Sequence, residues 1–340
     1  MTQQVCLVPY LQGLGGMVSF QGKFIQGLEK FNVEYTFDLA DPRNDAILVI
    51  GGTRQVPQLL KARKRGVRIV QRLNGMNWLH RVEKTPMKSW MRGETANMLL
   101  TFIRRSICER IIYQSEFSRW WWEDRHGKLE KPSRVIHNGI DLVSYTPEGK
   151  ERPPADRFRI LMVEGHLSGH YSHGLDVATH LCAMLQKMLE KPVELSIAGD
   201  VPESLKTHYQ EKFPALLINW VGVIPQEQIP ALDRSAHLLY SADLNAACPN
   251  SVIEALACGL PVLAFDTGAL SELVKIDSGA VVPYGGDHWK LDPPDIPALA
   301  QAALPILENN ATFRKAARLR AEEAFDLDNM TRSYLEVLLG

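Results

Sequence analysis

The sequence predicts an α/β protein with two domains, each built as a doubly wound parallel sheet. The chain has 340 residues, and a single core rarely serves so many, which favours two domains of about 150 residues each. Short apolar runs without internal proline alternate with helix-like segments along the chain. Charge divides it too: residues 1–150 hold 23 Lys and Arg against 14 Asp and Glu, while the remainder holds 15 against 25.

The first half begins with a strand expected at 5–9. A glycine turn that includes Gly15 and Gly16 follows, and then an amphipathic helix at 17–30. Strand, glycine turn and helix let backbone N–H groups approach a phosphate, although the spacing is not GxGxxG. Strand 46–50, helix 56–65 and strand 67–73 make a βαβ unit, so the sheet is expected to be parallel. Further strands are expected at 110–114 and 134–137.

Polar residues follow two of these strands. Asn74 comes directly after strand 67–73, and Asn138 comes directly after strand 134–137. Ligands of open parallel sheets bind outside the carboxyl ends of the strands, so both residues are expected to line a crevice. Segment 145–157 is rich in proline and charge and has no periodicity, so we interpret it as the linker between domains 1–150 and 151–326.

The second half repeats the alternation of strands and helices. It therefore predicts a second doubly wound domain. Its expected strands are 159–163, 193–198, 218–221, 238–241 and 262–265, and its expected helices are 175–189, 228–235 and 251–258.

The stretch 246–266 combines a short helix with the strand that follows it. Asn250 or Ser251 is expected to cap the helix, and Gly259 with Pro261 ends it. Two interpretations are open. In the first, Ser251 and Glu254, which have the spacing of a capping box, only cap the helix. In the second, the exposed N–H groups at the start of the helix form a site for a phosphate or diphosphate.

Three histidines, His166, His170 and His173, lie in one predicted loop. Their HxxxHxxH spacing allows a metal site, but no carboxylate or cysteine ligand is placed beside them. Imidazole groups that face a diphosphate, or that face solvent, are the other interpretations.

Five scattered cysteines and the absence of CxxC fit a reducing compartment. No apolar run approaches the ~20 residues of a membrane span, and the first ten residues do not resemble a signal peptide. We therefore expect a cytoplasmic protein. The basic run KARKRGVR at 61–68 is either a solvated helix face or a surface for anionic lipid, and an exposed tryptophan among Trp120, Trp121 and Trp122 would fit membrane contact.

Several motifs in order resemble a known family. They are GLGGM, YQSEFSRWW, VIHNGIDL, INWVGVIPQEQIPAL and CPNSVIEALACGLPVLAFDTGALSELV. Together they are similar to the retaining glycosyltransferases of family four, the glycosyl transferases group 1, which have the GT-B fold of two Rossmann-like domains facing across a cleft. The resemblance covers nearly the whole chain and is most specific at 249–274 and in the HNGID segment at 137–141.

The resemblance implies roles for residues on both sides of that cleft. Glu254 would hold the ribose of a nucleotide sugar, and backbone N–H groups at Asn250, Ser251 and Val252 would meet its diphosphate. From the first domain, Gly15 and Gly16 would approach the same diphosphate. The nucleobase would lie against the backbone around Val223 and Ile224, and Asn138 would lie near the cleft floor. A C-terminal helix within 327–340 is expected to cross back to the first domain.

The chain also departs from the family pattern. Ala246 stands where a second glutamate is usual, with Asp243 and Asn245 nearby as substitutes, although neither has the register of a simple replacement. His166 and His173 take the places of an arginine and a lysine. Arg72 and Asn74 are the side chains available where a histidine is common. The candidate catalytic residues are therefore Arg72, Asn74 and Asp243.

The resemblance implies retaining transfer of a sugar from a UDP- or GDP-linked donor to a hydroxyl of a carbohydrate or lipid-linked acceptor. Neither a cofactor nor a metal ion is expected, because the sequence has no DxD-type pair, and no nucleic acid is expected as a partner. Peripheral contact with the inner membrane face through the basic first domain would fit a lipid-linked acceptor. The alternatives are a catalytically silent nucleotide-sugar-binding or scaffold protein, and a sugar-nucleotide epimerase, for which the sequence offers no clear carboxylate pair.

Overall fold

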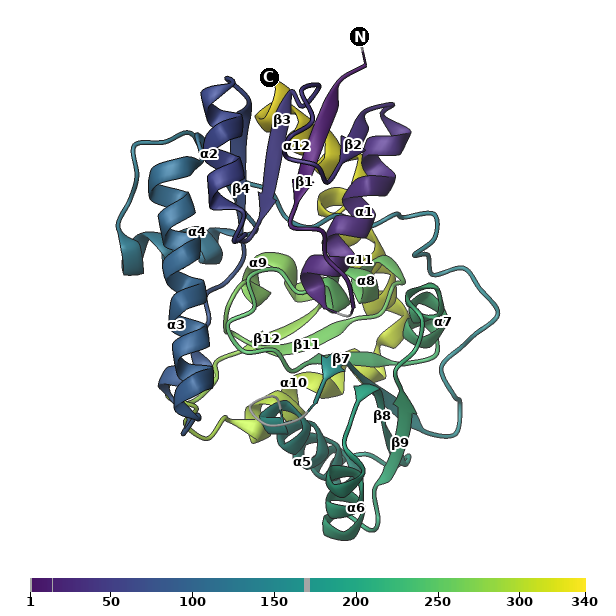
Figure 1. Ribbon diagram of the computed structural model, residues 1–340. Coiled ribbons are helices and arrows are strands. Elements are labelled where there is room, and N and C mark those ends of the chain that lie inside the picture. Colours follow the sequence, from purple (N-terminus) through teal and green to yellow (C-terminus); the bar gives the residue numbers. More distant parts are fainter. Residues whose placement is uncertain (1, 14, 168–171) are drawn as a thin grey trace. The chain divides into compact units, whose positions relative to one another are not determined.

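The computed structural model describes residues 2–13, 15–167 and 172–340 and divides the chain into two compact units (Figure 1). Unit 1 comprises Met1–Gly139 and Phe325–Gly340, and unit 2 comprises Ile140–Ala324. The division after Gly139 lies ahead of the boundary expected at 150, so segment 145–157 belongs to unit 2. His170 lies outside the described residues.

Unit 1 contains one sheet of six parallel strands in the order β2-β1-β3-β4-β5-β6. All residues of β1 and β3 are buried, which explains why both strands have continuous apolar sequences. The short edge strand β2 has the sequence EYT and gave no apolar signal. The strands are β1 (Gln4–Val8), β2 (Glu34–Thr36), β3 (Ala46–Ile50), β4 (Arg68–Leu73), β5 (Arg110–Tyr113) and β6 (Ser133–Val135).

Helices cover both faces of this sheet. One buried cluster joins α1 and α12 to the sheet, and a second joins α2, α4 and a π-helical turn at Ile103–Ile107 to the other face. The helices are α1 (Gly16–Lys30), α2 (Val56–Lys64), α3 (Met87–Phe102), α4 (Glu116–His126) and α12 (Leu327–Leu339), with a 3-10 turn at Leu79–Arg81. Among the described residues, every helix is too short or too polar to cross a lipid bilayer.

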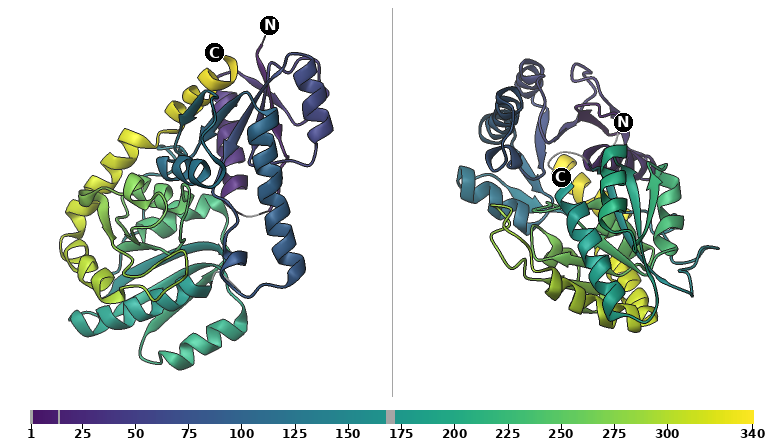
Figure 2. Two further views of the ribbon diagram at one scale, coloured as in Figure 1. Left: turned by 90° about the vertical axis from the view of Figure 1, so that its left-hand side faces the viewer. Right: turned by 90° about the horizontal axis from the view of Figure 1, so that it is seen from below.

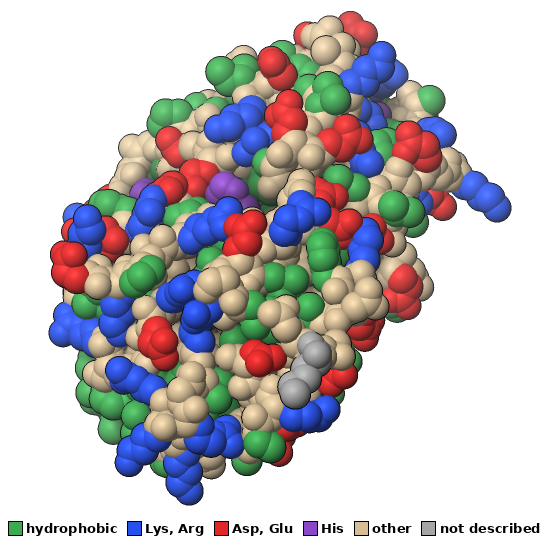
Figure 3. Space-filling model, turned by 90° about the horizontal axis from the view of Figure 1, so that it is seen from above, with side chains coloured by type: hydrophobic (Ala, Val, Ile, Leu, Met, Phe, Trp, Pro, Cys, Tyr) green, Lys and Arg blue, Asp and Glu red, His purple; other side chains and the backbone are tan. Residues whose placement is uncertain are grey.

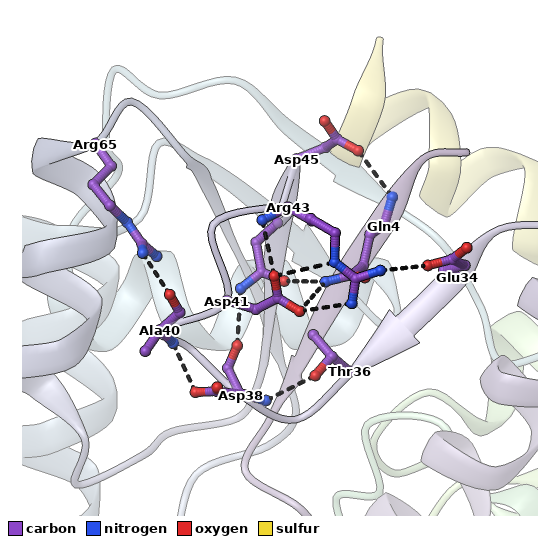
Figure 4. A network of polar contacts seen from close by, with 10 residues as sticks. Gln4, Glu34, Thr36, Asp38, Ala40, Asp41, Arg43, Asp45 and Arg65 are labelled. Carbon is purple, nitrogen blue, oxygen red and sulfur yellow. Dashed lines mark hydrogen bonds and ion pairs between the residues drawn. The ribbon is translucent and has the colours of Figure 1, made fainter. Parts of the chain in front are cut away.

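A network of polar contacts holds the loop that leads into β3 (Figure 4). Gln4 Nε2 donates to Asp41, whose carboxylate also accepts from the Arg43 guanidinium at 3.0 Å. Arg43 Nη1 reaches Glu34 at 3.2 Å. Hydrogen bonds from Arg43 hold the pKa of the Asp41 carboxyl at about 2. Since this network lies at the amino ends of β1, β2 and β3, it leaves the carboxyl edge of the sheet to other residues.

Unit 2 contains a second sheet of six parallel strands, in the order β12-β11-β10-β7-β8-β9. The predicted α/β fold with two doubly wound parallel sheets is therefore confirmed. The strands are β7 (Phe158–His166), β8 (Val193–Asp200), β9 (Leu217–Gly222), β10 (Leu238–Ser241), β11 (Val262–Phe265) and β12 (Gly279–Val282).

Strand β7 extends beyond the expected end at residue 163. It continues to His166, which pairs with Asp200 after an irregularity in the register. The helices of unit 2 lie around the sheet in Figures 1 and 2. They are α5 (Ser172–Met188), α6 (Glu203–Lys212), α7 (Ile229–Arg234), α8 (Asn250–Ala257), α9 (Leu270–Leu273), α10 (Ile296–Glu308) and α11 (Asn310–Ala324), with 3-10 turns at Gln226–Gln228 and Ile276–Ser278.

The packing of α12 on α1 is tight enough to test. Phe20 and Phe24 of α1 contact the Tyr334 ring, and Gly27 of α1 faces the buried Thr331 of α12. A Cβ atom at Gly27 would lie 2.1 Å from Thr331 Oγ1. No side chain fits there unless the helices separate.

We expect Gly27→Ala to lower the free energy of unfolding by about 1–3 kcal/mol, because the added methyl group overpacks the contact between α1 and α12. Urea unfolding measures the change. Gly22→Ala on the same helix is the control, since nothing lies within 4 Å of its added Cβ, and it should stabilise the helix by about 0.5–1 kcal/mol. Equal effects of the two substitutions would contradict the tight contact.

Candidate functional site

The strand order of unit 2 reverses between β7 and β10. From β7 the chain proceeds through β8 to β9 on one side, and β10, β11 and β12 follow on the other. The loops after β7 and β10 therefore leave toward opposite faces of the sheet, and ligands of such sheets bind in the crevice at this point. This makes the carboxyl ends of β7 and β10 the candidate site.

Helix α8 begins at the carboxyl edge without a side-chain cap. Its N-cap residue is Pro249, which has no side chain that could accept a hydrogen bond from the first turn. The expectation that Asn250 or Ser251 caps the helix is wrong, because the helix begins one residue earlier than expected and both lie inside it. Without a capping side chain or an acidic residue in the first turn, the positive end of the helix suits an anion.

Of the three residues expected to meet a diphosphate, Asn250 and Ser251 are half-buried and Val252 is fully buried. A fully buried apolar side chain has no polar group to offer. Val252 can contribute to such a site through its backbone N–H alone.

Glu254 lies on the buried side of α8, with 7% of its surface exposed. Its charge acts on two groups of the same unit. Burial and then the Glu254 charge raise the pKa of Asp233 on α7 well above its ordinary value, and the same two causes raise the pKa of Tyr145. Tyr145 also donates a hydrogen bond to the Gln226 carbonyl oxygen at 3.4 Å.

The loop after β9 carries the residues expected to contact a nucleobase. Val223 is exposed and Ile224 is half-buried. Tyr145 contacts Gln226 in the continuation of this loop, and it lies close enough to Glu254 for the Glu254 charge to raise its pKa. Tyr145 therefore lies between the residues expected to contact the nucleobase and the residue expected to bind the ribose. Sequence reasoning missed Tyr145, which lies in the segment interpreted as a linker.

Two carboxylates meet where the strand order reverses. Leu239 of β10 pairs with Leu161 of β7, so the two strand ends lie side by side. Glu164 near the end of β7 and Asp243 just after β10 are neighbours, and burial followed by the Asp243 charge raises the pKa of Glu164. The pKa of Asp243 is raised as well, because protein atoms surround its carboxyl group. The expectation that the chain offers no carboxylate pair is therefore wrong. Glu164 escaped notice because strand β7 was expected to end at residue 163.

Two buried polar side chains near this pair have no hydrogen-bond partner among the described residues. They are Ser241, at the end of β10, and Asn245, whose amide lacks a partner at both its nitrogen and its oxygen. Asn245 also has a left-handed backbone, with φ 58°. Unpaired buried polar groups cost free energy, and they are typical of places where water or a ligand binds.

The two candidate histidines have separate partners. His166 Nδ1 lies 2.9 Å from the Asp200 carboxylate at the end of β8. His173 Nε2, near the start of α5, lies 3.2 Å from the Tyr284 hydroxyl. Burial lowers the pKa of His173, so this ring is neutral at pH 7 and can only donate or accept a hydrogen bond. Within the described ranges, no three His, Cys, Asp or Glu side chains are grouped closely enough to hold a metal ion.

In unit 1, the structure brings three predicted residues together. Arg72 donates to Asn138 Oδ1 at 2.7 Å and to Asn74 Oδ1 at 3.0 Å. Its guanidinium carbon lies 3.6 Å from the centre of the Phe20 ring, and its Nε donates to the Tyr334 hydroxyl. Because Arg72 is buried and engaged on all sides, the geometry gives it the task of orienting the two asparagines. A catalytic role of Arg72 and Asn74 stays a prediction.

The glycine turn of unit 1 is open. Gly15 has a φ of 124° and is the N-cap residue of α1, which starts at Gly16 with neither a capping side chain nor an acidic residue in its first turn. A Cβ added at Gly15 would meet nothing within 4 Å. A large group can therefore approach this backbone, and the positive φ favours glycine.

Comparisons with known proteins agree with the family resemblance. Residues 158–309 match the family model of the glycosyl transferases group 1. A GDP-mannose-dependent alpha-(1-6)-phosphatidylinositol dimannoside mannosyltransferase of Mycobacterium tuberculosis is 28% identical over 214 residues, which covers 59% of this chain and 50% of the relative. The amylovoran biosynthesis glycosyltransferase AmsK of Erwinia amylovora is 29% identical over 177 residues, 48% of this chain and 41% of that protein. The matches thus span about half the length of these curated relatives or less.

Solved structures share the fold over nearly the whole chain. HepE of Anabaena in complex with UDP-glucose has a TM-score of 0.70 and 16% identity, and the match covers 98% of this chain and 99% of that one. A glycosyltransferase from Rickettsia africae has the same TM-score and identity, with 99% and 97% covered. The expected resemblance to the glycosyl transferases group 1 with a GT-B fold is confirmed.

Asp233 on α7 and Glu254 on α8 are neighbouring acids, and Asp233 provides a test of the local electrostatics. Asp233 is buried, its Oδ2 has no hydrogen-bond partner among the described residues, and its pKa is raised. The native protein therefore keeps this proton to higher pH than the unfolded chain does, and its contribution to the free energy of unfolding falls as the pH rises above about 4.

We expect Asp233→Asn to raise the melting temperature relative to the unsubstituted protein at pH 8, and the gain to shrink toward pH 4.5. Thermal unfolding across this range measures it. Asp277→Asn, at an exposed position of the same unit, is the control and should give no pH-dependent difference. A destabilisation that grows with pH would show that Asp233 is ionised in the native protein.

Proposed function

Since residues 158–309 match the glycosyl transferases group 1 and the chain has the GT-B fold, we propose that it is a retaining glycosyltransferase. It transfers a sugar from a UDP- or GDP-linked donor to a hydroxyl of a carbohydrate or lipid-linked acceptor, and it needs no metal ion. The observation that carries the proposal is the uncapped start of α8 with Glu254 one turn further on, inside the matched region.

The donor is proposed to lie along the carboxyl edge of the sheet of unit 2. Backbone N–H groups in the first turn of α8 bind its diphosphate, and Glu254 accepts hydrogen bonds from the ribose hydroxyls. The nucleobase lies against the backbone at Ile224, which Tyr145 connects to the neighbourhood of Glu254. The relatives' names support both nucleotides, since one is GDP-mannose-dependent and one solved structure holds UDP-glucose.

The proposed reaction depends on stabilising the leaving group. The bond between the anomeric carbon and the diphosphate oxygen breaks, and its electron pair remains on the diphosphate. Fixed N–H dipoles of α8 stabilise the charge that grows there, without any reorganisation of the protein. The acceptor oxygen attacks the same face of the sugar, so the configuration is retained, and its proton passes to the departing phosphate.

Turnover and product stereochemistry test this function directly. The purified protein is incubated with UDP- and GDP-sugars, with and without simple glycoside or glycolipid acceptors, and nucleotide release is followed with and without EDTA. NMR of the product gives the anomeric configuration. Tight nucleotide-sugar binding without turnover would favour the silent binding protein, an inverted product would contradict retention, and loss of turnover in EDTA would contradict metal independence.

We expect Glu254→Gln to weaken UDP or GDP binding by about 1–3 kcal/mol, because a charge-assisted hydrogen bond to the ribose becomes a weaker neutral one. Isothermal titration calorimetry measures the affinity, and thermal unfolding checks the fold. Because the substitution also removes a charge beside Asp233, the melting temperature should not fall. The exposed Glu308 of α10 supplies the control variant Glu308→Gln, and unchanged nucleotide affinity in Glu254→Gln would remove the ribose role.

For a lipid-linked acceptor, we propose that unit 1 contacts an anionic bilayer through α3. The buried residue of this helix is Asn97, whereas Met87, Met91 and Met98 are exposed on one side of it. Trp90 and Phe102 are exposed as well. Unit 1 is rich in basic residues, and Figure 3 shows many Lys and Arg side chains on the face seen from above. An apolar stripe on a basic unit matches the two components of interfacial binding.

We expect the double substitution Met91→Glu and Met98→Glu to lower binding to phosphatidylglycerol vesicles by about tenfold, because it removes apolar area and adds negative charge. Co-sedimentation measures binding. Leu319→Glu places the same charge at an exposed apolar position of unit 2 and should leave binding within about twofold. Equal losses in both proteins would contradict a specific role for α3.

A further inference from the structure

The loop between β12 and α10 has no assigned task in the proposed reaction (Figure 1). It runs from Tyr284 to Asp295, and Asp295 N donates to the Tyr284 carbonyl oxygen at 2.7 Å. Further along, Asp287 N donates to Asp292 Oδ2 at 3.0 Å. The loop is therefore closed at its base and again halfway to its tip. Compact surface loops of about 6–16 residues whose ends meet in this way are frequently functional.

The backbone of this loop is fixed in a strained form. Leu291 has a φ of 59°, which residues with a branched side chain rarely adopt. A Cβ added at Gly286 would lie 2.7 Å from the Cβ of Asp292, so the two sides of the loop touch. Asp287 Oδ1 accepts a hydrogen bond from Trp289 N at 3.0 Å and holds the tip in place. Strain of this kind is typical of segments that hold a side chain for a ligand.

A row of rings connects the tip of the loop to the core of unit 2. The ring centres of the buried Phe265 and Tyr284 lie 5.1 Å apart. His288 follows at 5.9 Å from Tyr284, and Trp289 follows at 5.3 Å from His288. His288 and Trp289 are only half-buried, so the row ends at the surface. Because the Tyr284 hydroxyl lies 3.2 Å from His173 Nε2, the row also starts beside α5 at the carboxyl edge of the sheet.

His288 presents a hydrogen-bond donor at the surface. Its Nδ1 is buried and has no partner among the described residues, whereas its Nε2 is accessible and also makes no hydrogen bond with them. Burial lowers the pKa of His288, so the ring is neutral at pH 7 and carries one proton. Buried N–H groups without an acceptor are rarer than buried acceptors without a donor. The proton therefore lies on Nε2.

The charges around the tip favour an uncharged ligand. Residues 284–295 contain three aspartates and one lysine, and Lys290 Nζ already lies 2.9 Å from Asp287 Oδ2. Asp266, at the end of β11, adds negative charge that acts on His288. A phosphate or an anionic lipid headgroup would be repelled here. A sugar ring is neutral. It has C–H groups that pack on an indole face, and hydroxyl oxygens that accept a hydrogen bond from an imidazole N–H.

We propose that His288 and Trp289 form a binding site for a neutral sugar ring of the acceptor. One face of the ring packs on the Trp289 indole, and a hydroxyl oxygen accepts a hydrogen bond from His288 Nε2. The proposal rests on the proposed function and narrows its acceptor to a molecule with a sugar at or beside the accepting hydroxyl. The site lies on the same edge of unit 2 as the proposed donor, to which Tyr284 and His173 connect it.

The test measures binding of sugars in the absence of any nucleotide. The probes are the methyl α-glycosides of mannose and glucose and their α-linked disaccharides, followed by saturation-transfer NMR at millimolar concentration. In Trp289→Ala, we expect the Kd of the bound probe to rise about tenfold, whereas Trp289→Phe keeps an aromatic face and should change it by about threefold or less. Ile276→Ala, which removes an exposed apolar side chain elsewhere in unit 2, is the control and should leave the Kd unchanged.

Two variants of His288 separate hydrogen bonding from a merely structural role. His288→Ala removes the donor and should raise the Kd about fivefold, whereas His288→Gln supplies an amide N–H and should stay within about twofold. The affinity for UDP or GDP should be unchanged in both. His208→Ala, at an exposed position of α6, is the matched control. Equal losses in His288→Ala and His288→Gln would contradict the donor role.

The outcomes separate this proposal from the proposed function. If the protein binds the probes through His288 and Trp289 but releases no nucleotide from any nucleotide sugar, only the proposed function fails. If it transfers a sugar to a methyl glycoside with the same KM in Trp289→Ala, only the sugar site fails. Absence of probe binding to the unsubstituted protein would also overturn the site. Loss of binding to phosphatidylglycerol vesicles in Trp289→Ala, with sugar binding intact, would assign the loop to lipid instead.

Discussion

The reversal of strand order between β7 and β10 is the constraint on which the site of unit 2 depends. Parallel strands need crossover connections, and those connections leave toward opposite faces on the two sides of the reversal. A crevice opens between them at the strand ends. Glu164 and Asp243 are at least partly exposed there, whereas every residue of β10 and β11 is buried. Topology thus decides where side-chain chemistry can reach a ligand.

Most of the sheet strands could be predicted from the sequence because burial on both faces produces continuous apolar runs. The strands expected at 46–50, 238–241 and 262–265 have those bounds in the structure. Helix α3 could not be predicted, because a helix that buries little besides Asn97 has no apolar stripe facing a core. Edge strand β2 could not be predicted for the same physical reason, since none of its three residues is fully buried.

The candidate site was predictable in part. Glu254 and the start of α8 stand out through sequence spacing, although the N-cap was misplaced by a residue because Pro249 has no capping side chain to reveal it. Glu164 could not be recognised, since its partner Asp243 lies far along the chain and only pairing of β7 with β10 brings the two together. Arg72 shows the opposite case. Its position near a strand end suggested a catalytic role, whereas the structure shows a buried guanidinium that donates hydrogen bonds to Asn74 and Asn138 and orients them.

Charges of opposite kind meet along one edge of unit 2. The start of α8 presents backbone N–H groups and the positive end of a helix dipole, while Glu164, whose pKa is raised, and Asp243 place carboxyl groups on the same edge. A small inorganic anion is attracted by the start of α8 and repelled by the acidic pair. A metal cation is attracted by the acidic pair and repelled by the start of α8. A ligand that carries an anionic group at one end and neutral hydroxyl groups at the other satisfies both. Nucleoside diphosphate sugars have this distribution, so the electrostatics of the edge favour a donor bound in one direction, with its sugar toward the strand reversal.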